Sequence, residues 1–155
     1  MLRIHQPEYD SLRQHGEESY PNECCGVLLG RPSTGEDGAS VVSVVRTGNA
    51  YMGSAHNRYQ IAPEDLIRIQ RGARQQGLEI VGFYHSHPDH PAQWSQTDLM
   101  GAYWLGCSYV ITSVYKDGAR CRAQETNAFL LTGSGEGDKH LEASPIAVLN
   151  SVAVA

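Results

Sequence analysis

Two histidines separated by one residue stand close to a serine and an aspartate in one stretch of this chain. They are His85, His87, Ser95 and Asp98, within the run VGFYHSHPDHPAQWSQTD. In an extended segment side chains alternate between faces, so the two imidazoles point the same way and can converge on one ion. Imidazole and carboxylate ligands with a fourth position left open are typical of a catalytic zinc. The spacing therefore predicts a zinc site made by His85, His87 and Asp98.

The serine and the aspartate also carry the pattern of a helix start. Ser95-Gln-Thr-Asp precedes an apolar run, so Ser95 or Thr97 can cap a helix over residues 95–105. From the first turn, Asp98 can reach back to the histidines. Each half of the pattern has an ordinary explanation, a solvated or packed histidine and a simple capping box. A strand on one side and a helix on the other together favour the metal site.

The pattern His-x-His, seven residues, Ser-x-x-Asp, with a glutamate upstream, resembles the JAMM (MPN-plus, Mov34/PAD-1) zinc metalloproteases. Their glutamate stands in a Pro-x-Glu-x-Cys-Gly context, and this chain has Pro21-Asn-Glu-Cys-Cys-Gly26. The resemblance implies that Glu23 is the general base that takes a proton from the attacking water and hands it to the leaving amine. It implies that the Ser95 hydroxyl stabilises the oxyanion of the tetrahedral intermediate. It also implies one Zn²⁺ per chain. Glu18, the nearest other acid, lies in a polar stretch where a solvated charge is the better explanation.

The resemblance further implies a substrate class. Members of the family hydrolyse amide bonds at the C-terminal Gly-Gly of ubiquitin or ubiquitin-like proteins. The short step from His87 to Ser95 leaves no room inside the motif for the insertions that grip ubiquitin, so the chain is similar to the compact prokaryotic members. The expected partner is a ubiquitin-like, sulfur-carrier-type protein with a C-terminal Gly-Gly. Two alternatives stay open: a non-catalytic MPN module that binds such a partner, and a metallohydrolase of small amides.

Composition limits the class of protein. The chain has 155 residues and 41% hydrophobic content, enough for one core and too short for two. Its net charge of −5 and the absence of a basic run argue against nucleic acid as a partner. No stretch approaches the roughly 20 apolar residues of a membrane span, and the N-terminus lacks the apolar core of a secretory signal. We therefore expect a cytoplasmic protein without a membrane partner, and a homodimer is compatible with the sequence.

Cysteines and loop aromatics offer weaker signals. Cysteines at positions 24, 25, 107 and 121 include no Cys-x-x-Cys pair, so a zinc knuckle is disfavoured and reduced thiols fit the compartment. Core packing also explains them better than a nucleophilic thiol. Tyr59 and Trp94, in loops on either side of the metal-bearing strand, are equally well explained by substrate contact and by local packing.

Patterning along the chain predicts alternating helices and strands. Helices are expected at about 7–19, 63–77 and 95–105. Strands are expected at about 24–30, 41–45, 79–87, 107–114, 119–125 and 128–132, with the first two forming a hairpin. This order indicates an α/β (α+β) fold, and the resemblance implies a three-layer sandwich, a mixed β-sheet flanked by helices in the cytidine-deaminase-like MPN arrangement. We expect the metalloprotease domain to span 1–132 and residues 133–155 to form a flexible Gly-rich segment and a tail of uncertain structure.

Overall fold

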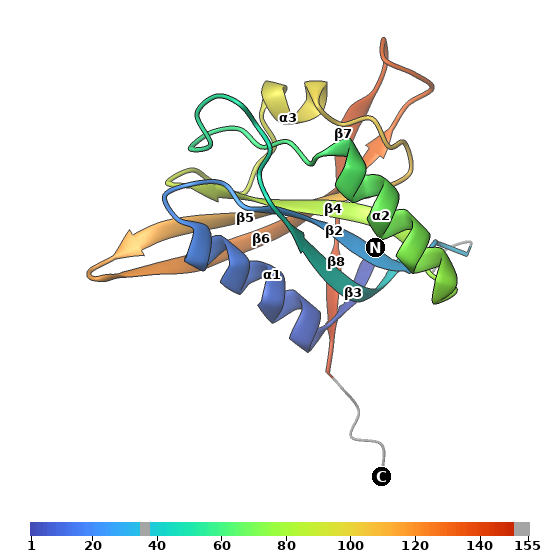
Figure 1. Ribbon diagram of the computed structural model, residues 1–155, viewed down its shortest axis with the longest axis horizontal. Helices are drawn as coiled ribbons and strands as arrows, with labels where there is room; N and C mark the ends of the chain where they lie inside the picture. Colours follow the sequence, from blue (N-terminus) through green and yellow to red (C-terminus); the bar gives the residue numbers. More distant parts are fainter. Residues whose placement is uncertain (35–37, 151–155) are drawn as a thin grey trace.

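One eight-stranded sheet organises the described part of the computed structural model, residues 1–34 and 38–150 (Figure 1). Its strands are β1 (Leu2–His5), β2 (Cys25–Arg31), β3 (Ser40–Thr47), β4 (Glu79–Pro88), β5 (Ser108–Asp117), β6 (Arg120–Thr132), β7 (His140–Ser144) and β8 (Ile146–Leu149). The helices are α1 (Gln6–Ser19), α2 (Pro63–Gln75) and α3 (Gln96–Met100). The strand order is β7-β6-β5-β4-β2-β3-β1-β8. Parallel and antiparallel pairs both occur, so the predicted mixed sheet in an α+β fold is confirmed, while the three-layer arrangement stays a prediction.

Strand β4 lies in the middle of the sheet and is buried along nearly its whole length. It pairs antiparallel with β2 and parallel with β5, and the predicted β2–β3 hairpin is also formed. The turn predicted within 31–38 lies partly outside the described residues. His85 is paired with Cys25 on one side and with Ile111 on the other. Both neighbours fix the backbone of the strand that carries His85 and His87.

Helices α1 and α2 pack on two different hydrophobic clusters. Leu12 of α1 belongs to the cluster that contains Tyr84, whereas Ile69 and Ala73 of α2 belong to the cluster that contains Phe83. Successive side chains of a strand point to opposite faces, so the alternation along β4 separates the two clusters. His85, two residues beyond the phenylalanine, therefore lies on the same face as α2.

Helix α1 approaches β4 closely because it carries a glycine at the contact. A Cβ atom at Gly16 would lie 3.0 Å from a methyl group of Val114 and 3.3 Å from the Cβ atom of Ser86. Glycine disfavours a helix interior by about 1 kcal/mol relative to alanine. Here it allows α1 to lie against the strand that carries the two histidines.

The third predicted helix is shorter than expected. The prediction was a helix over 95–105, but α3 ends at Met100 and Gly101 follows as its C-cap. Beyond it, Ala102 is fully buried and Trp104 packs edge-on against Phe83. Burial of these side chains in the core outweighs the helical pattern of the apolar run.

Two further differences concern the strands. The separate strands predicted at 119–125 and 128–132 are one continuous strand, β6. Its pairing with β5 shifts register near residue 113 of β5. Strands β1, β7 and β8 were not predicted. The last two lie within 133–155, where the sequence pattern placed no element, and β8 pairs with β1 at the sheet edge.

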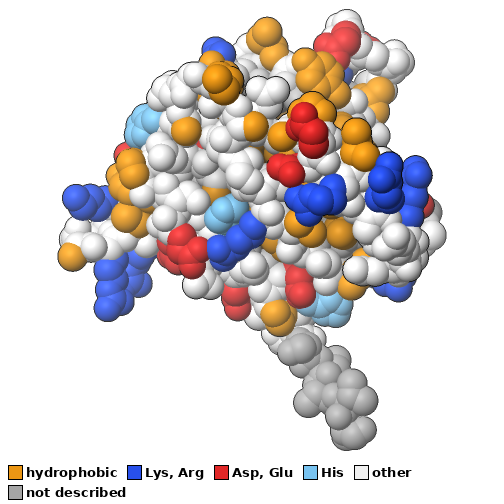
Figure 2. Space-filling model, in the orientation of Figure 1, with side chains coloured by type: hydrophobic (Ala, Val, Ile, Leu, Met, Phe, Trp, Pro, Cys, Tyr) orange, Lys and Arg blue, Asp and Glu red, His pale blue; other side chains and the backbone are white. Residues whose placement is uncertain are grey.

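Charged side chains of both signs are spread over the visible surface. Figure 2 shows Lys and Arg side chains over α2 and at the far end of the β5–β6 hairpin, with acidic side chains between them. The exposed basic residues at these places include Arg68, Arg71, Lys116 and Arg120. Among the described residues, no helix has the length and apolar character required to cross a bilayer.

His15, on α1, predicts a pH dependence of stability. Its Nδ1 atom lies 2.8 Å from the hydroxyl oxygen of Tyr84. Burial, reinforced by the nearby Arg46, lowers the pKa of His15 from 6.5 to about 4. As the pH falls below 6.5 the unfolded chain takes up this proton before the folded protein does. We therefore expect the contribution of His15 to lower the unfolding midpoint of metal-free protein as the pH is lowered from 6.5 to 4.

The measurement is thermal unfolding in the presence of a chelator, across that pH range. His15→Gln, which keeps a polar side chain near the tyrosine, should lose less stability than wild type as the pH is lowered over this range. His5→Gln, at an exposed position, serves as the matched control and should follow wild type. Equal slopes for wild type and His15→Gln would contradict the prediction.

Candidate metal centre

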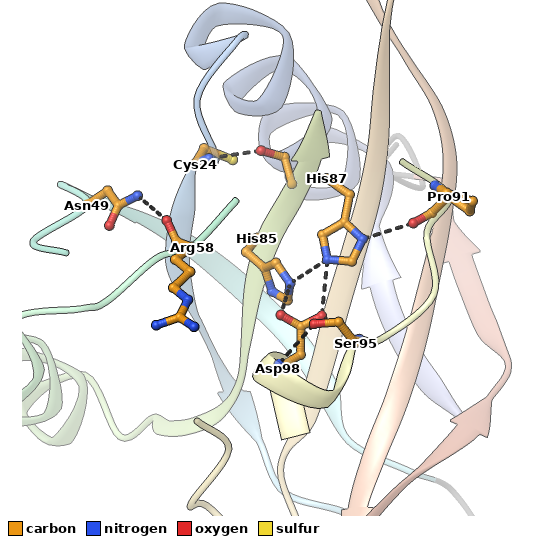
Figure 3. Close-up of polar contacts among 9 residues, drawn as sticks. Cys24, Asn49, Arg58, His85, His87, Pro91, Ser95 and Asp98 are labelled. Carbon is orange, nitrogen blue, oxygen red and sulfur yellow. Dashed lines mark hydrogen bonds and ion pairs between the residues drawn. The ribbon is translucent and has the colours of Figure 1, made fainter. Parts of the chain in front are cut away.

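The three predicted metal ligands lie together where β4 meets α3. Nε2 of His85 is 3.2 Å from Oδ1 of Asp98, and Nε2 of His87 is 3.1 Å from Oδ2 of the same carboxylate. The two Nε2 atoms are 3.2 Å apart. Figure 3 shows both imidazoles on β4 turned toward the aspartate on α3. Among the described residues these three side chains form the group suited to hold a metal ion.

Asp98 is held in place by a reciprocal capping box. The Oγ of Ser95 accepts a hydrogen bond from the Asp98 backbone N–H at 3.1 Å, and Oδ2 of Asp98 accepts one from the Ser95 N–H at 2.9 Å (Figure 3). The capping interpretation is therefore confirmed, and the same carboxylate belongs to the group of side chains that could hold a metal ion. A helix of five residues is positioned by the same bonds that aim its carboxylate at the histidines.

His87 is oriented through its other ring nitrogen. Its Nδ1 lies 2.9 Å from the carbonyl oxygen of Pro91, so the proton on Nδ1 can be donated to that carbonyl (Figure 3). This tautomer leaves the lone pair on Nε2 free for a metal. Residues 88–94, which supply this carbonyl, are held by Asn127, whose side-chain amide donates to the Ala92 carbonyl at 2.9 Å.

His85 is oriented by stacking. The ring of Tyr59 stacks on the imidazole with centroids 4.3 Å apart and an angle of 23° between the ring planes. Nδ1 of His85 is buried and has no hydrogen-bond partner among the described residues. From the sequence, substrate contact and local packing explained Tyr59 equally well. The structure instead places Tyr59 against the predicted ligand His85, a contact that no sequence signal indicated. Trp94, in contrast, packs against the hydrophobic core.

The donor set fits a divalent cation such as zinc. Although burial opposes it, the adjacent imidazoles of His85 and His87 hold the pKa of the Asp98 carboxyl well below its usual range, so this carboxylate is charged. Ligand atoms about 2.0–2.1 Å from a tetrahedral zinc lie roughly 3.3 Å from one another. The separations of 3.1 to 3.2 Å found here match that value. Two nitrogens and one carboxylate oxygen are the ligands of several catalytic zinc sites.

Glu23 lies just before β2, and its backbone is fixed on both sides. Its N–H donates to the Ala55 carbonyl at 2.8 Å, and its carbonyl accepts from the Asn49 side chain at 3.4 Å. The side chain is 6% exposed, and its Oε1 atom is buried without a hydrogen-bond partner among the described residues. Burial raises the pKa of Glu23 to about 8, with the charges of His87 and Asp98 acting in opposite directions. An unpaired buried carboxyl beside the histidines is costly unless a cation is near.

The nearest other acid has a different environment. The side chain of Glu18 is half exposed and forms an ion pair of 2.6 Å with Arg46. This confirms the expectation of a solvated charge and leaves Glu23 as the acid whose pKa is affected by the predicted ligands His87 and Asp98.

Thiols do not compete for the catalytic role. Cys24 and Cys25 are buried and free, and burial raises the pKa of Cys24 to about 12 and that of Cys25 to about 11. Nucleophilic cysteines require a lowered pKa. These thiols stay protonated and pack in the core, as the sequence indicated.

Comparison with known proteins agrees with this geometry. The profile of prokaryotic homologues of the JAB domain matches residues 5–128. A protein of Haloferax volcanii named desampylase is 32% identical over 108 residues, which cover 67% of this chain and 74% of that protein. A probable TtuB-protein conjugate cleaving protease of Thermus thermophilus is 30% identical over 111 residues, covering 72% and 68%.

Two solved structures share the fold. The solution structure of a Desulfitobacterium hafniense protein superimposes with a TM-score of 0.76 at 22% identity, covering 99% of this chain and 96% of that one. The solution structure of a Salinibacter ruber protein gives a TM-score of 0.65 at 35% identity, covering 99% and 94%. Because the matched residues 5–128 span most of the sequence and include every residue of the predicted site, the chain belongs to the JAB (JAMM/MPN) family, among its prokaryotic members.

Proposed function

We propose that this chain is a zinc-dependent peptidase or isopeptidase that hydrolyses the amide bond after the C-terminal Gly-Gly of a ubiquitin-like, sulfur-carrier-type protein. The observation that carries the proposal is Glu23, a buried carboxyl without a hydrogen-bond partner among the described residues, next to a complete set of metal ligands. A binding module needs no base at this position. The names of the two relatives, a desampylase and a conjugate-cleaving protease, support a protein conjugate as the substrate.

His85, His87 and Asp98 would hold the zinc ion. When bound, zinc polarises the scissile carbonyl and brings the pKa of a water molecule to about 7. Glu23 would accept a proton from the attacking water and donate it to the nitrogen of the leaving amine when the C–N bond breaks. A neighbouring cation favours the ionised carboxylate, which opposes the effect of burial on its pKa.

Ser95 would stabilise the oxyanion. Its Oγ already accepts a hydrogen bond from the Asp98 N–H, so its own O–H proton is free to be donated. A fixed donor aimed at the position where negative charge develops stabilises the transition state more than the substrate.

Ser95→Ala is expected to lower kcat by about 10²–10³-fold, the usual effect of losing one oxyanion donor. It should also lower the free energy of unfolding by about 1 kcal/mol, because the alanine cannot cap α3. Ser95→Asp keeps a capping acceptor but has no proton to donate to an oxyanion, so it separates the two effects. Turnover measured beside urea unfolding tests this, and an unchanged kcat in a correctly folded Ser95→Ala protein would remove the serine from the mechanism.

The proposed function is tested with purified, zinc-reconstituted protein and a ubiquitin-like domain ending in Gly-Gly that is joined by an amide bond to a reporter amine. Mass spectrometry should detect the domain with a free Gly-Gly carboxylate and the released amine, and a chelator should stop the reaction. Tight binding without cleavage would favour the non-catalytic module. Cleavage of glycyl amides of small amines, with the protein conjugate untouched, would favour the small-amide hydrolase.

A further inference from the structure

An aromatic cavity of about 290 Å³ adjoins the metal centre. Its lining includes Tyr59, Ile61, Leu66, Phe83, Trp104 and Tyr109. The cavity shares one wall with the metal centre, because the tyrosine at 59 also stacks on His85. Phe83 precedes His85 by two residues on β4, so both side chains lie on the same face of the sheet. This volume lies at the lower end of the range for ligand-binding cavities, about 300–1,000 Å³, and leaves room for an apolar side chain.

The position of the cavity indicates which part of a substrate could reach it. An extended peptide advances about 3.3 Å per residue. The two glycines next to the cut bond have no side chains, so the first side chains available lie roughly 7–10 Å from the reacting carbonyl. The two-residue step along β4 from His85 to Phe83 covers roughly 7 Å, a similar distance. Glu23, which would serve the leaving amine, precedes β2 on one side of β4, whereas Tyr109 of the cavity lining lies on β5, on the other side of β4. The acyl side of the substrate is therefore the side that faces the cavity.

The outer wall of the cavity is formed by the segment after α3, which contains Gly101, Tyr103 and Trp104. This segment is irregular, and Met100 and Tyr103 are 63% and 69% exposed. Figure 2 shows hydrophobic side chains at the surface over α3 and the residues that follow it. An exposed aromatic segment without regular structure needs other contacts to keep its shape.

Lys139 supplies those contacts. Its Nζ donates to the Ala102 carbonyl at 2.8 Å and to the Met100 carbonyl at 3.3 Å, and it lies 4.7 Å from the centre of the Tyr103 ring. The lysine side chain is only 7% exposed, although Glu136, its ionic partner, is 69% exposed. Such burial of a lysine is uncommon. Here the ammonium group satisfies one carbonyl at the end of α3 and one just beyond its C-cap.

The lysine is itself fixed by the turn that joins β6 to β7. The Asp138 carboxylate accepts hydrogen bonds from the backbone N–H groups of Ser134 and Gly135 and from the Ser134 hydroxyl. Gly133 has a φ of +123°, which favours glycine, and a Cβ atom there would come within 2.8 Å of the Asp138 carbonyl oxygen. This turn lies outside residues 5–128, the region that the family profile matches.

We propose that the cavity receives an apolar side chain from the residues immediately before the Gly-Gly of the substrate, and that Lys139 is a positioning residue that holds the outer wall of this cavity. The inference rests on the proposed function, since it assigns a specificity to the same site. Lys139 acts through the main chain of residues 100–104 and touches no reacting atom. Without the ammonium group, two carbonyls lose their donor and the aromatic wall is released.

The test uses two conjugates of one ubiquitin-like domain, with leucine or glutamate at both positions before the Gly-Gly. Wild-type protein should cleave the leucine conjugate at least about tenfold more efficiently, as expected when one apolar pocket discriminates. In Lys139→Met the KM for the leucine conjugate should rise, so the ratio of kcat/KM for the leucine and glutamate conjugates should approach one. Zinc content and kcat for the glutamate conjugate should stay unchanged. Lys139→Arg should restore part of the preference. Lys116→Met changes the other lysine of the chain, which is exposed, and is the matched control that should behave as wild type.

A second readout does not depend on catalysis. Binding of free peptides with Leu-Leu-Gly-Gly or Glu-Glu-Gly-Gly ends is followed by the fluorescence of Trp104 in a Trp94→Phe background. The leucine peptide should change the fluorescence and the glutamate peptide should not. If wild type cleaves neither conjugate but binds the leucine peptide, the proposed function fails while the cavity assignment stands.

Other outcomes overturn the inference itself. Equal cleavage of both conjugates together with no difference in peptide fluorescence would overturn the cavity assignment. An undiminished preference in folded Lys139→Met protein would overturn the positioning role. Should Lys139→Met fail to fold, Asp138→Ala provides the test, because it loosens the turn and leaves the lysine in place. If Asp138→Ala does not reduce the preference for the leucine conjugate, the positioning role is overturned.

Discussion

Replacing Glu23 with glutamine is expected to lower kcat on a Gly-Gly conjugate by about 10²–10⁴-fold, the usual contribution of a general acid–base group. Glutamine has nearly the same shape but cannot take up a proton from water. The backbone contacts of residue 23 with Ala55 and Asn49 do not involve its side chain, so they remain. Zinc content should also stay near one per chain, since the proposed ligands are His85, His87 and Asp98. Turnover and elemental analysis on the same preparation give both values.

The control for this variant is Glu18→Gln, which changes an exposed acid that pairs with Arg46. It should leave kcat and zinc content unchanged. Thermal unfolding of metal-free Glu23→Gln protein should show a midpoint equal to or above that of wild type, because a buried unpaired carboxyl is replaced by a neutral amide. A folded, zinc-loaded Glu23→Gln protein that cleaves at the wild-type rate would remove Glu23 from the mechanism. Loss of zinc from this variant would instead make the glutamate a ligand.

The metal cluster could be predicted from sequence because its geometry is local. His85 and His87 share a face of one strand, and Asp98 is fixed to Ser95 by a capping box within the next element. Each relation spans three residues or fewer, so alternation and capping rules apply directly. Only the approach of α3 to β4 required the tertiary structure. Helix α2 could be predicted for the same reason, since Pro63 begins it and Gly77, with a φ of +71°, follows its end.

Features that depend on distant contacts could not be predicted in this way. Tyr59 stacks on His85 from a loop 26 positions earlier in the chain, and Asn127 holds the Ala92 carbonyl from a strand 35 positions later. Lys139 lies in a Gly-rich stretch whose composition indicated flexibility, yet it is bonded to the carbonyl of Ala102. None of these residue types at these positions has a periodic or capping signature. The early end of α3 also depends on a distant contact, since Trp104 packs against Phe83 of β4.

Exchanging both His85 and His87 for alanine is expected to abolish zinc binding, because a single carboxylate on α3 would remain of the three ligands. Wild type should carry about one zinc per chain. A zinc ion that binds the folded state and not the unfolded state stabilises the protein by about 4 kcal/mol when the free zinc concentration is a thousand times its Kd. The wild-type unfolding midpoint should therefore rise when zinc is added to metal-free protein, and that of the double variant should not.

The matched control is the exchange of two exposed histidines, His5 and His90, for alanine. This variant keeps the metal centre and should retain both the zinc content and the zinc-dependent rise in midpoint. Circular dichroism shows whether each protein is folded before metal is added. Retention of zinc by the His85/His87 double variant would place the metal elsewhere in the chain. A folded wild-type protein that takes up no zinc even after reconstitution would rule out the metallopeptidase, because the buried acid Glu23 would then have no cation to compensate its burial. The non-catalytic binding module would then be the better explanation.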